Sequence, residues 1–134
     1  MTRLTVDDFL TGLFAALSST GWIGLSIRDE SFDKGLVPAF DKLVQLAPDK
    51  KLNINFRIRL SRFHGDSITV RDAIYSAAQR GLISLDNPEY QYIRFLFGHE
   101  QAEDILQGIP GGKALFQDIA KEFINSYEVV PVAN

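Results

Sequence analysis

The most regular pattern in the chain is an alternation of apolar and polar residues between positions 52 and 60. Every second residue is apolar, and the five are Leu52, Ile54, Phe56, Ile58 and Leu60. Because side chains in a strand point to alternate faces, this period of two predicts a β-strand with one buried face. The opposite face then carries polar side chains toward water or a partner, namely Asn53, Asn55, Arg57 and Arg59.

Apolar residues at spacings of three and four predict five helices. The segments are 6–18, 36–47, 70–80, one that begins at His99, and 114–127. Two of them begin with the Thr-x-x-Asp pattern of a capping box, at residues 5–8 and 69–72. Pro38 fits the first turn of the second helix, where a missing N–H breaks no hydrogen bond, and Gly81 fits the end of the third.

Two segments stay open to more than one reading. Residues 22–27 are short, apolar and β-prone, and no state is assigned to them. Residues 82–97 form a hairpin if Asn87-Pro88-Glu89 is a turn, or contain a helix start if Asn87 is a cap and Pro88 opens the helix. The enrichment in Tyr, Ile and Phe favours the hairpin, with the second strand over 90–97.

These elements predict an α+β fold: one mostly helical domain over residues 1–134 with a small antiparallel sheet and a flexible tail at 128–134. A length of 134 residues is that of one ordinary domain. A helix followed by Gly81-Leu82-Ile83 and a hairpin resembles part of a winged-helix domain, over residues 69–97. That resemblance implies contact with DNA or RNA.

The N-terminal run from Phe9 to Ile27 is uncharged over 19 residues, close to the length of a membrane span. Eight of those residues are Gly, Ser or Thr, and Asp7 and Asp8 precede the run where a signal peptide carries positive charge. A helix followed by a short strand or turn explains the run better. We therefore expect no membrane partner and a cytoplasmic location.

The composition excludes several kinds of chemistry. The chain has no Cys, so it has no disulfide, no thiolate nucleophile and no Cys-ligated metal. Only two His are present, so a His-rich metal cage is not expected. The net charge of −3 hides a contrast: segment 50–71 has six basic residues and one Asp, a net +5, whereas the rest of the chain carries −8.

The basic face of the predicted strand is the first candidate binding site. It consists of Asn53, Asn55, Arg57 and Arg59, extended by Arg62 and Arg71. Arg guanidinium groups and Asn amides suit phosphates, carboxylates or base edges. The alternative is a solvated sheet face whose charges pair with the protein's own acids. A second candidate is the side of the second hairpin strand that Tyr90, Tyr92 and Arg94 share, which suits a protein interface, core packing or hairpin stabilisation.

No complete catalytic or cofactor motif is present, so no enzyme activity, cofactor or metal is predicted. The segment from Gly108 to Ala114 is similar to a phosphate-binding loop but lacks its Ser or Thr, and it fits a helix–helix connection better. Ser67 has no evident general base. His99 and Glu103 share a helical face and supply at most half of a metal site.

The leading functional hypothesis is a non-enzymatic protein-interaction module, a small regulatory or adaptor subunit of a larger cytoplasmic assembly. The alternative is a winged-helix-like DNA- or RNA-binding regulator that uses the local Arg patch. A third hypothesis, a small-molecule enzyme, would need His64 and Asp66 to meet Arg side chains in a pocket. The partner's identity and the oligomeric state do not follow from the sequence.

Overall fold

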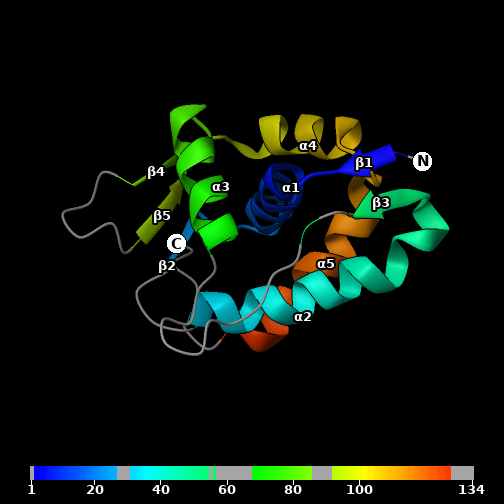
Figure 1. Ribbon diagram of the computed structural model, residues 1–134. Helices are drawn as coiled ribbons and strands as arrows, with labels where there is room; N and C mark the ends of the chain where they lie inside the picture. The colour runs from blue at the N-terminus through cyan, green and yellow to red at the C-terminus, as the bar shows by residue number, and fades with distance from the viewer. Residues whose placement is uncertain (1, 27–30, 55, 57–67, 86–91, 128–134) are drawn as a thin grey trace.

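A computed structural model describes residues 2–26, 31–54, 56, 68–85 and 92–127, and it confirms a mostly helical α+β fold (Figure 1). In chain order the elements are β1 (Thr2–Leu4), α1 (Val6–Ser19), β2 (Gly24–Ser26), α2 (Ser31–Leu46), the 3-10 turn η1 (Pro48–Lys50), β3 (Leu52–Ile54), α3 (Ile68–Gln79), β4 (Ile83–Ser84), β5 (Tyr92–Phe95), α4 (His99–Gly108) and α5 (Gly112–Ser126). The predicted tail at 128–134 lies outside the described residues.

The described strands form two small sheets. The first has the order β2-β5-β4 and is antiparallel throughout, with Leu25 opposite Ile93 and Ile83 opposite Phe95. The predicted hairpin is therefore confirmed as the β4–β5 pair, and the unassigned segment 22–27 contains β2. The second sheet joins β1 and β3 in parallel, which the alternation of residues 52–60 does not predict.

Helix α1 is the centre of the core. From Phe9 to Leu17, every residue except Thr11 is buried. A helix that is apolar on all sides must be covered on all sides, and α3, α4 and α5 pack around this one. The long uncharged N-terminal run is thus a core helix followed by β2. In the part of the chain that the structure describes, no helix has the length and hydropathy needed to cross a membrane.

The capping box at the start of α1 is confirmed. The Thr5 hydroxyl accepts a hydrogen bond from the Asp8 backbone N–H, and the Asp8 carboxylate accepts one from the Thr5 N–H, both at 3.1 Å. These two bonds satisfy donors that the helix itself leaves free. They also orient β1, which precedes the cap directly.

Aromatic side chains connect the helices to the strands. Phe14 of α1 lies 5.4 Å from Phe95 of β5, measured between ring centroids, and so fixes the antiparallel sheet against the core helix. The ring of Phe56 packs against Phe9 of α1 and Phe40 of α2, at centroid distances of 6.0 and 5.4 Å. This contact agrees with the predicted inward direction of Phe56.

Two glycines allow α5 to pack closely against its neighbours. A Cβ at Gly12 of α1 would lie 2.4 Å from the Phe116 ring, and a Cβ at Gly35 of α2 would lie 2.8 Å from the Phe123 ring. Both Phe rings are fully buried. Helix α5 therefore uses one Phe against α1 and the other against α2, at positions where only glycine leaves enough room.

Tyr127, directly after α5, holds the edge of the antiparallel sheet. Its hydroxyl accepts a hydrogen bond from the Ser26 N–H at 2.8 Å and donates one to the Ser26 carbonyl at 3.1 Å. Ser26 lies in β2, an edge strand of the described sheet, so these bonds replace part of a missing neighbouring strand. The Tyr127 ring stacks on Phe123 and contacts Trp22.

Two predicted helix starts were wrong. Helix α2 begins at Ser31 rather than 36, so Pro38 lies inside it. Pro38 lacks the N–H that a helix interior normally uses, but the apolar stripe continues backwards through the buried Leu36 and Phe32, and this packing outweighs the lost hydrogen bond. Helix α3 begins at Ile68, so Thr69 lies in its first turn instead of preceding it.

The other predicted elements hold with small shifts. Helices α4 and α5 cover the two C-terminal segments, and Gly81 follows α3 with φ +77°, as expected for a residue that ends a helix. The strand predicted over 52–60 is observed for Leu52–Ile54, and residues 55 and 57–60 lie outside the described part.

We predict that Gly12→Ala and Gly35→Ala each destabilise the protein. Alanine gains about 1 kcal/mol of helix propensity, but the added methyl group has to displace a buried Phe ring, and overpacking of this kind lowers the free energy of unfolding by about 1–3 kcal/mol. Chemical denaturation monitored by circular dichroism measures the change.

Gly108→Ala is the matched control, because Gly108 is also helical and a Cβ added there would meet nothing within 4 Å. We expect this variant to be as stable as the wild type or more so. A loss of stability in Gly108→Ala equal to that in Gly12→Ala would contradict the explanation by ring contact.

Candidate functional site

The residues of the predicted basic face are only partly described. Asn53 is exposed on β3 and Arg71 is exposed on α3, whereas Asn55, Arg57, Arg59 and Arg62 lie outside the described residues. In Figure 1, β3 and α3 lie on opposite sides of α1. The structure therefore does not bring Asn53 and Arg71 together, and a continuous arginine face remains a prediction.

The parallel pairing of β1 with β3 adds a residue that the sequence analysis missed. Arg3 is the register partner of Asn53, and both side chains are exposed. Register partners in adjacent strands project to the same side of a sheet, with backbones about 4.8 Å apart. A guanidinium from the N-terminus thus joins the face that carries Asn53. The three residues of β1 have no periodic pattern that could have predicted this pairing.

The outward side of β5 carries two of the predicted interface residues. Ile93 and Phe95 are buried, whereas Arg94 is exposed and Tyr92 is half-buried, as the alternation predicts. Tyr90 lies outside the described residues. The Tyr92 hydroxyl would lie 2.7 Å from a Cβ at Gly24, so the phenol lies across the glycine of β2. Burial raises the pKa of Tyr92 above its ordinary value of 10.0, and the neighbouring Arg94 guanidinium opposes that shift in part.

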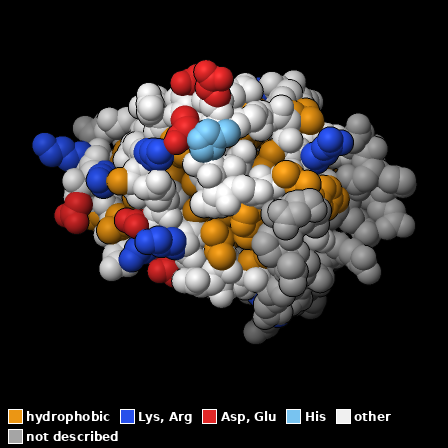
Figure 2. Space-filling model, turned by 180° about the vertical axis from the view of Figure 1, so that it is seen from behind, with side chains coloured by type: hydrophobic (Ala, Val, Ile, Leu, Met, Phe, Trp, Pro, Cys, Tyr) orange, Lys and Arg blue, Asp and Glu red, His pale blue; other side chains and the backbone are white. Residues whose placement is uncertain are grey.

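Large apolar side chains are exposed at the end of the same sheet. Leu96 follows β5 with 53% of its surface exposed, and Ile23 precedes β2 with 49% exposed. Backbone hydrogen bonds from Phe95 N–H to Ile23 C=O and from Leu96 N–H to Leu82 C=O, both 2.9 Å, hold this end in place. We name Ile23, Arg94 and Leu96 the sheet patch. Figure 2 shows a basic side chain among hydrophobic ones over this end of the molecule.

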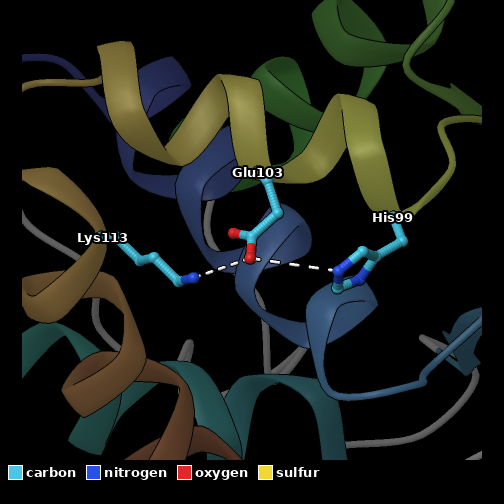
Figure 3. A network of polar contacts seen from close by, with 3 residues as sticks. All are labelled: His99, Glu103 and Lys113. Atoms are coloured by element: carbon cyan, nitrogen blue, oxygen red, sulfur yellow. Dashed lines mark hydrogen bonds and ion pairs between the residues drawn. The ribbon is translucent and has the colours of Figure 1, made fainter.

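A polar network joins α4 to α5 (Figure 3). The Lys113 ammonium lies 2.6 Å from Glu103 Oε1, and His99 Nε2 lies 4.0 Å from the same oxygen. Glu103 Oε2 is buried and accepts no hydrogen bond within the described part. The predicted shared face of His99 and Glu103 is confirmed. The described residues include no group of three or more His, Asp or Glu side chains placed to hold a metal ion.

The Gly108–Lys113 segment forms the connection between α4 and α5, as the helix–helix interpretation predicted. Its Lys113 side chain turns back to the Glu103 carboxylate and ties the two helices together. Both partners are partly exposed, so this ion pair contributes on the order of 1 kcal/mol or less. The geometry therefore supports a structural role for the network of His99, Glu103 and Lys113.

Helix α3 presents a mixed outer surface. Tyr75 is 49% exposed, and Arg71 is exposed on the same helix, with Arg80 exposed directly after it. The Arg80 guanidinium donates a hydrogen bond of 3.3 Å to the Thr11 hydroxyl of α1. Asp72 adds a negative charge beside Arg71. The surface thus offers two cations and an aromatic ring, with one acid among them.

We predict that Tyr92→Phe removes a phenol whose pKa is raised above the ordinary value of 10.0 by burial. Because the pKa of Tyr92 is raised in the folded state, its contribution to stability is complete below pH 10 and falls as the pH rises through the folded-state pKa. Ultraviolet absorbance of tyrosinate, followed from pH 8 to 12, should lose a component that titrates above the ordinary tyrosine pKa in this variant. Tyr75→Phe is the control for the loss of one phenol, and a Tyr92→Phe titration whose lost component has its midpoint below pH 10 would contradict burial of this side chain.

Comparison with known proteins returned no match. No protein-family model, no curated protein and no solved structure is significantly similar to the chain. Functional statements about this protein therefore rest on the surfaces described above.

Proposed function

We propose that this protein is a non-enzymatic interaction module, a small regulatory or adaptor subunit that acts in the cytoplasm and binds another protein through the sheet patch. The observation that carries the proposal is the exposure of Leu96 and Ile23 at the same hydrogen-bonded end of the antiparallel sheet, with the exposed Arg94 two residues before Leu96. Single exposed apolar residues are common, but Leu96 follows Arg94 on the outward side of its strand, and an apolar side chain beside an Arg has the composition of an interface centre.

The support for these side chains also favours binding. The backbones of residues 95 and 96 are fixed by hydrogen bonds to two different neighbouring segments. Phe95 and Phe97, on either side of Leu96, are buried and stacked at 5.7 Å, so they anchor the segment from below. A side chain on such a rigid base loses little conformational entropy when a partner covers it.

We predict that Leu96→Asp abolishes partner binding and leaves the fold intact. Covering a half-exposed Leu stabilises a complex by about 1–2 kcal/mol, and a buried unpaired carboxylate opposes binding further, so the affinity should fall at least about tenfold. The measurement is the amount of each protein that copurifies with the tagged chain from its native host, quantified by mass spectrometry.

Val44→Asp is the matched control, because Val44 is 48% exposed and lies on α2, away from the sheet. Copurifying proteins that persist in Val44→Asp and disappear in Leu96→Asp support the proposal. Identical copurification with both variants and the wild type refutes the sheet patch as the interface.

A second candidate function is nucleic-acid binding by a winged-helix-like unit. The observation in its favour is that α3 leads directly into the antiparallel β4–β5 pair and that β2 completes the sheet. Arg71, Arg80 and Tyr75 on the α3 surface would then contact the nucleic acid. Against it, α2 packs extensively on α5 rather than on α3, so the helix pair of a helix-turn-helix is not formed by these two elements.

If this second function holds, the double variant Arg71→Glu, Arg80→Glu should weaken duplex DNA binding and make it less dependent on salt. Each lost phosphate contact lowers the slope of log K against log salt by about 1. Fluorescence anisotropy at salt concentrations from about 25 to about 200 mM measures the slope. The control is Lys42→Glu, Lys121→Glu, which changes the charge equally on α2 and α5; absence of wild-type binding at low salt eliminates this function.

A further inference from the structure

Four polar residues gather where β1 meets β3, and we name them the basic end: Arg3, Lys50, Lys51 and Asn53. All four are exposed. Figure 2 shows basic side chains at the left of that view, the end that carries β1 and β3 in Figure 1, with acidic side chains interspersed among them. Three of the four residues are cationic, in a chain whose net charge is −3.

The backbone brings these residues together and keeps them in place. The Thr2 N–H donates a hydrogen bond of 3.0 Å to the Lys51 carbonyl, which begins the parallel ladder. Leu4 and Leu52 point inward and are buried, so the two strands are anchored to the core on one side. Arg3 and Asn53 consequently project outward as neighbours on a fixed base.

Lys51 has an unusual backbone conformation. Its φ of 56° and ψ of 43° place it in the left-handed region, where a side chain is strained and glycine is preferred. Among the described residues, no other residue besides glycine has a positive φ. The backbone conformation of this turn would suit glycine better than lysine. What Lys51 adds over a glycine at this position is its exposed ammonium group.

We propose that the basic end binds an acidic, carboxylate-bearing segment of a partner protein. The proposal rests on the proposed function, in that the partner is a protein. The exposed Asn53 amide donates a hydrogen bond to a carboxylate, and the Arg3 side chain beside it adds a positive charge that attracts the same group. The lysines at 50 and 51 attract a second carboxylate farther along the segment.

The charges around the basic end favour a peptide over a nucleic acid. Asp49 is exposed directly before the two lysines, and Asp7 and Asp8 lie in the first turn of α1, shortly after β1. These acids repel the dense and regular phosphates of a duplex. A protein segment carries only a few carboxylates, and it can bind with these placed away from Asp7, Asp8 and Asp49.

The test uses the full chain and a fluorescein-labelled peptide of about ten residues in which a few glutamates are separated by Gly and Ser, with binding followed by fluorescence polarisation at about 20 and about 150 mM salt. We expect wild-type binding at the lower salt concentration. Lys51→Gly should weaken it by about two- to fivefold, the size of one exposed ion pair, while the melting temperature stays the same or rises because glycine relieves the strain. A loss of binding without a loss of stability is a result that a purely structural lysine would not give.

Lys121→Ala removes one charge from the exposed side of α5 and is the matched control. The inference is overturned if the wild type does not bind the peptide at the lower salt concentration, or if Lys121→Ala weakens binding as much as Lys51→Gly, because net charge would then explain the effect. It is also overturned if a short DNA duplex binds in a Lys51-dependent way and the peptide does not, because the basic end would then be a nucleic-acid contact.

The variant Leu96→Asp separates this inference from the proposed function. Peptide binding at the basic end does not require the sheet patch, so this variant should bind the glutamate peptide like the wild type. Unchanged copurification with Leu96→Asp refutes the sheet patch alone, whereas Lys51-independent peptide binding refutes the basic end alone.

Discussion

Burial of α1 is the constraint on which the rest of the structure depends. Between Phe9 and Leu17 the helix presents apolar atoms in every direction, and no amphipathic arrangement could satisfy it. Helices α3, α4 and α5 and the antiparallel sheet cover it from different sides. The Phe116 ring of α5 lies against Gly12 of α1. The distance between α1 and α5 is therefore set by a contact between this ring and the backbone of α1. The surfaces left for function are those that face away from α1.

Local features of the fold could be predicted, and features that depend on distant pairing could not. Helix α1, its capping box and the Gly81 helix end follow from residues within one or two turns of each other. Strand β1 has three residues and no pattern, and its partner β3 lies beyond two intervening helices in the chain. The start of α2 was misplaced because Pro38 is a stronger local feature than the tertiary contacts of Phe32 that outweigh it.

The same distinction between local pattern and distant pairing applies to the residues of the candidate site. Alternation predicted that Tyr92 and Arg94 share one side of the strand, which the structure shows to be the less buried side, and the same alternation continued by two residues would have included Leu96. No alternation in the sequence predicts that Ile23 is exposed, because its exposure depends on the residue at which β2 begins. Arg3 joined the candidate residues only through the parallel register with Asn53. Sequence patterns report which face a side chain occupies, but they do not report which faces of separate strands become continuous.

The two proposed surfaces differ in the kind of energy that they offer a partner. The sheet patch is mainly apolar, so in the proposed complex it would slow dissociation by removing surface from water. The basic end is mainly charged, so in the proposed complex it would accelerate association and fix orientation, and its contribution would fall with salt. The two lie at opposite ends of the molecule, with α1 between them (Figure 1). A single partner must therefore extend along the whole domain to reach both, or two partners must bind separately, and the second arrangement is the one that an adaptor requires.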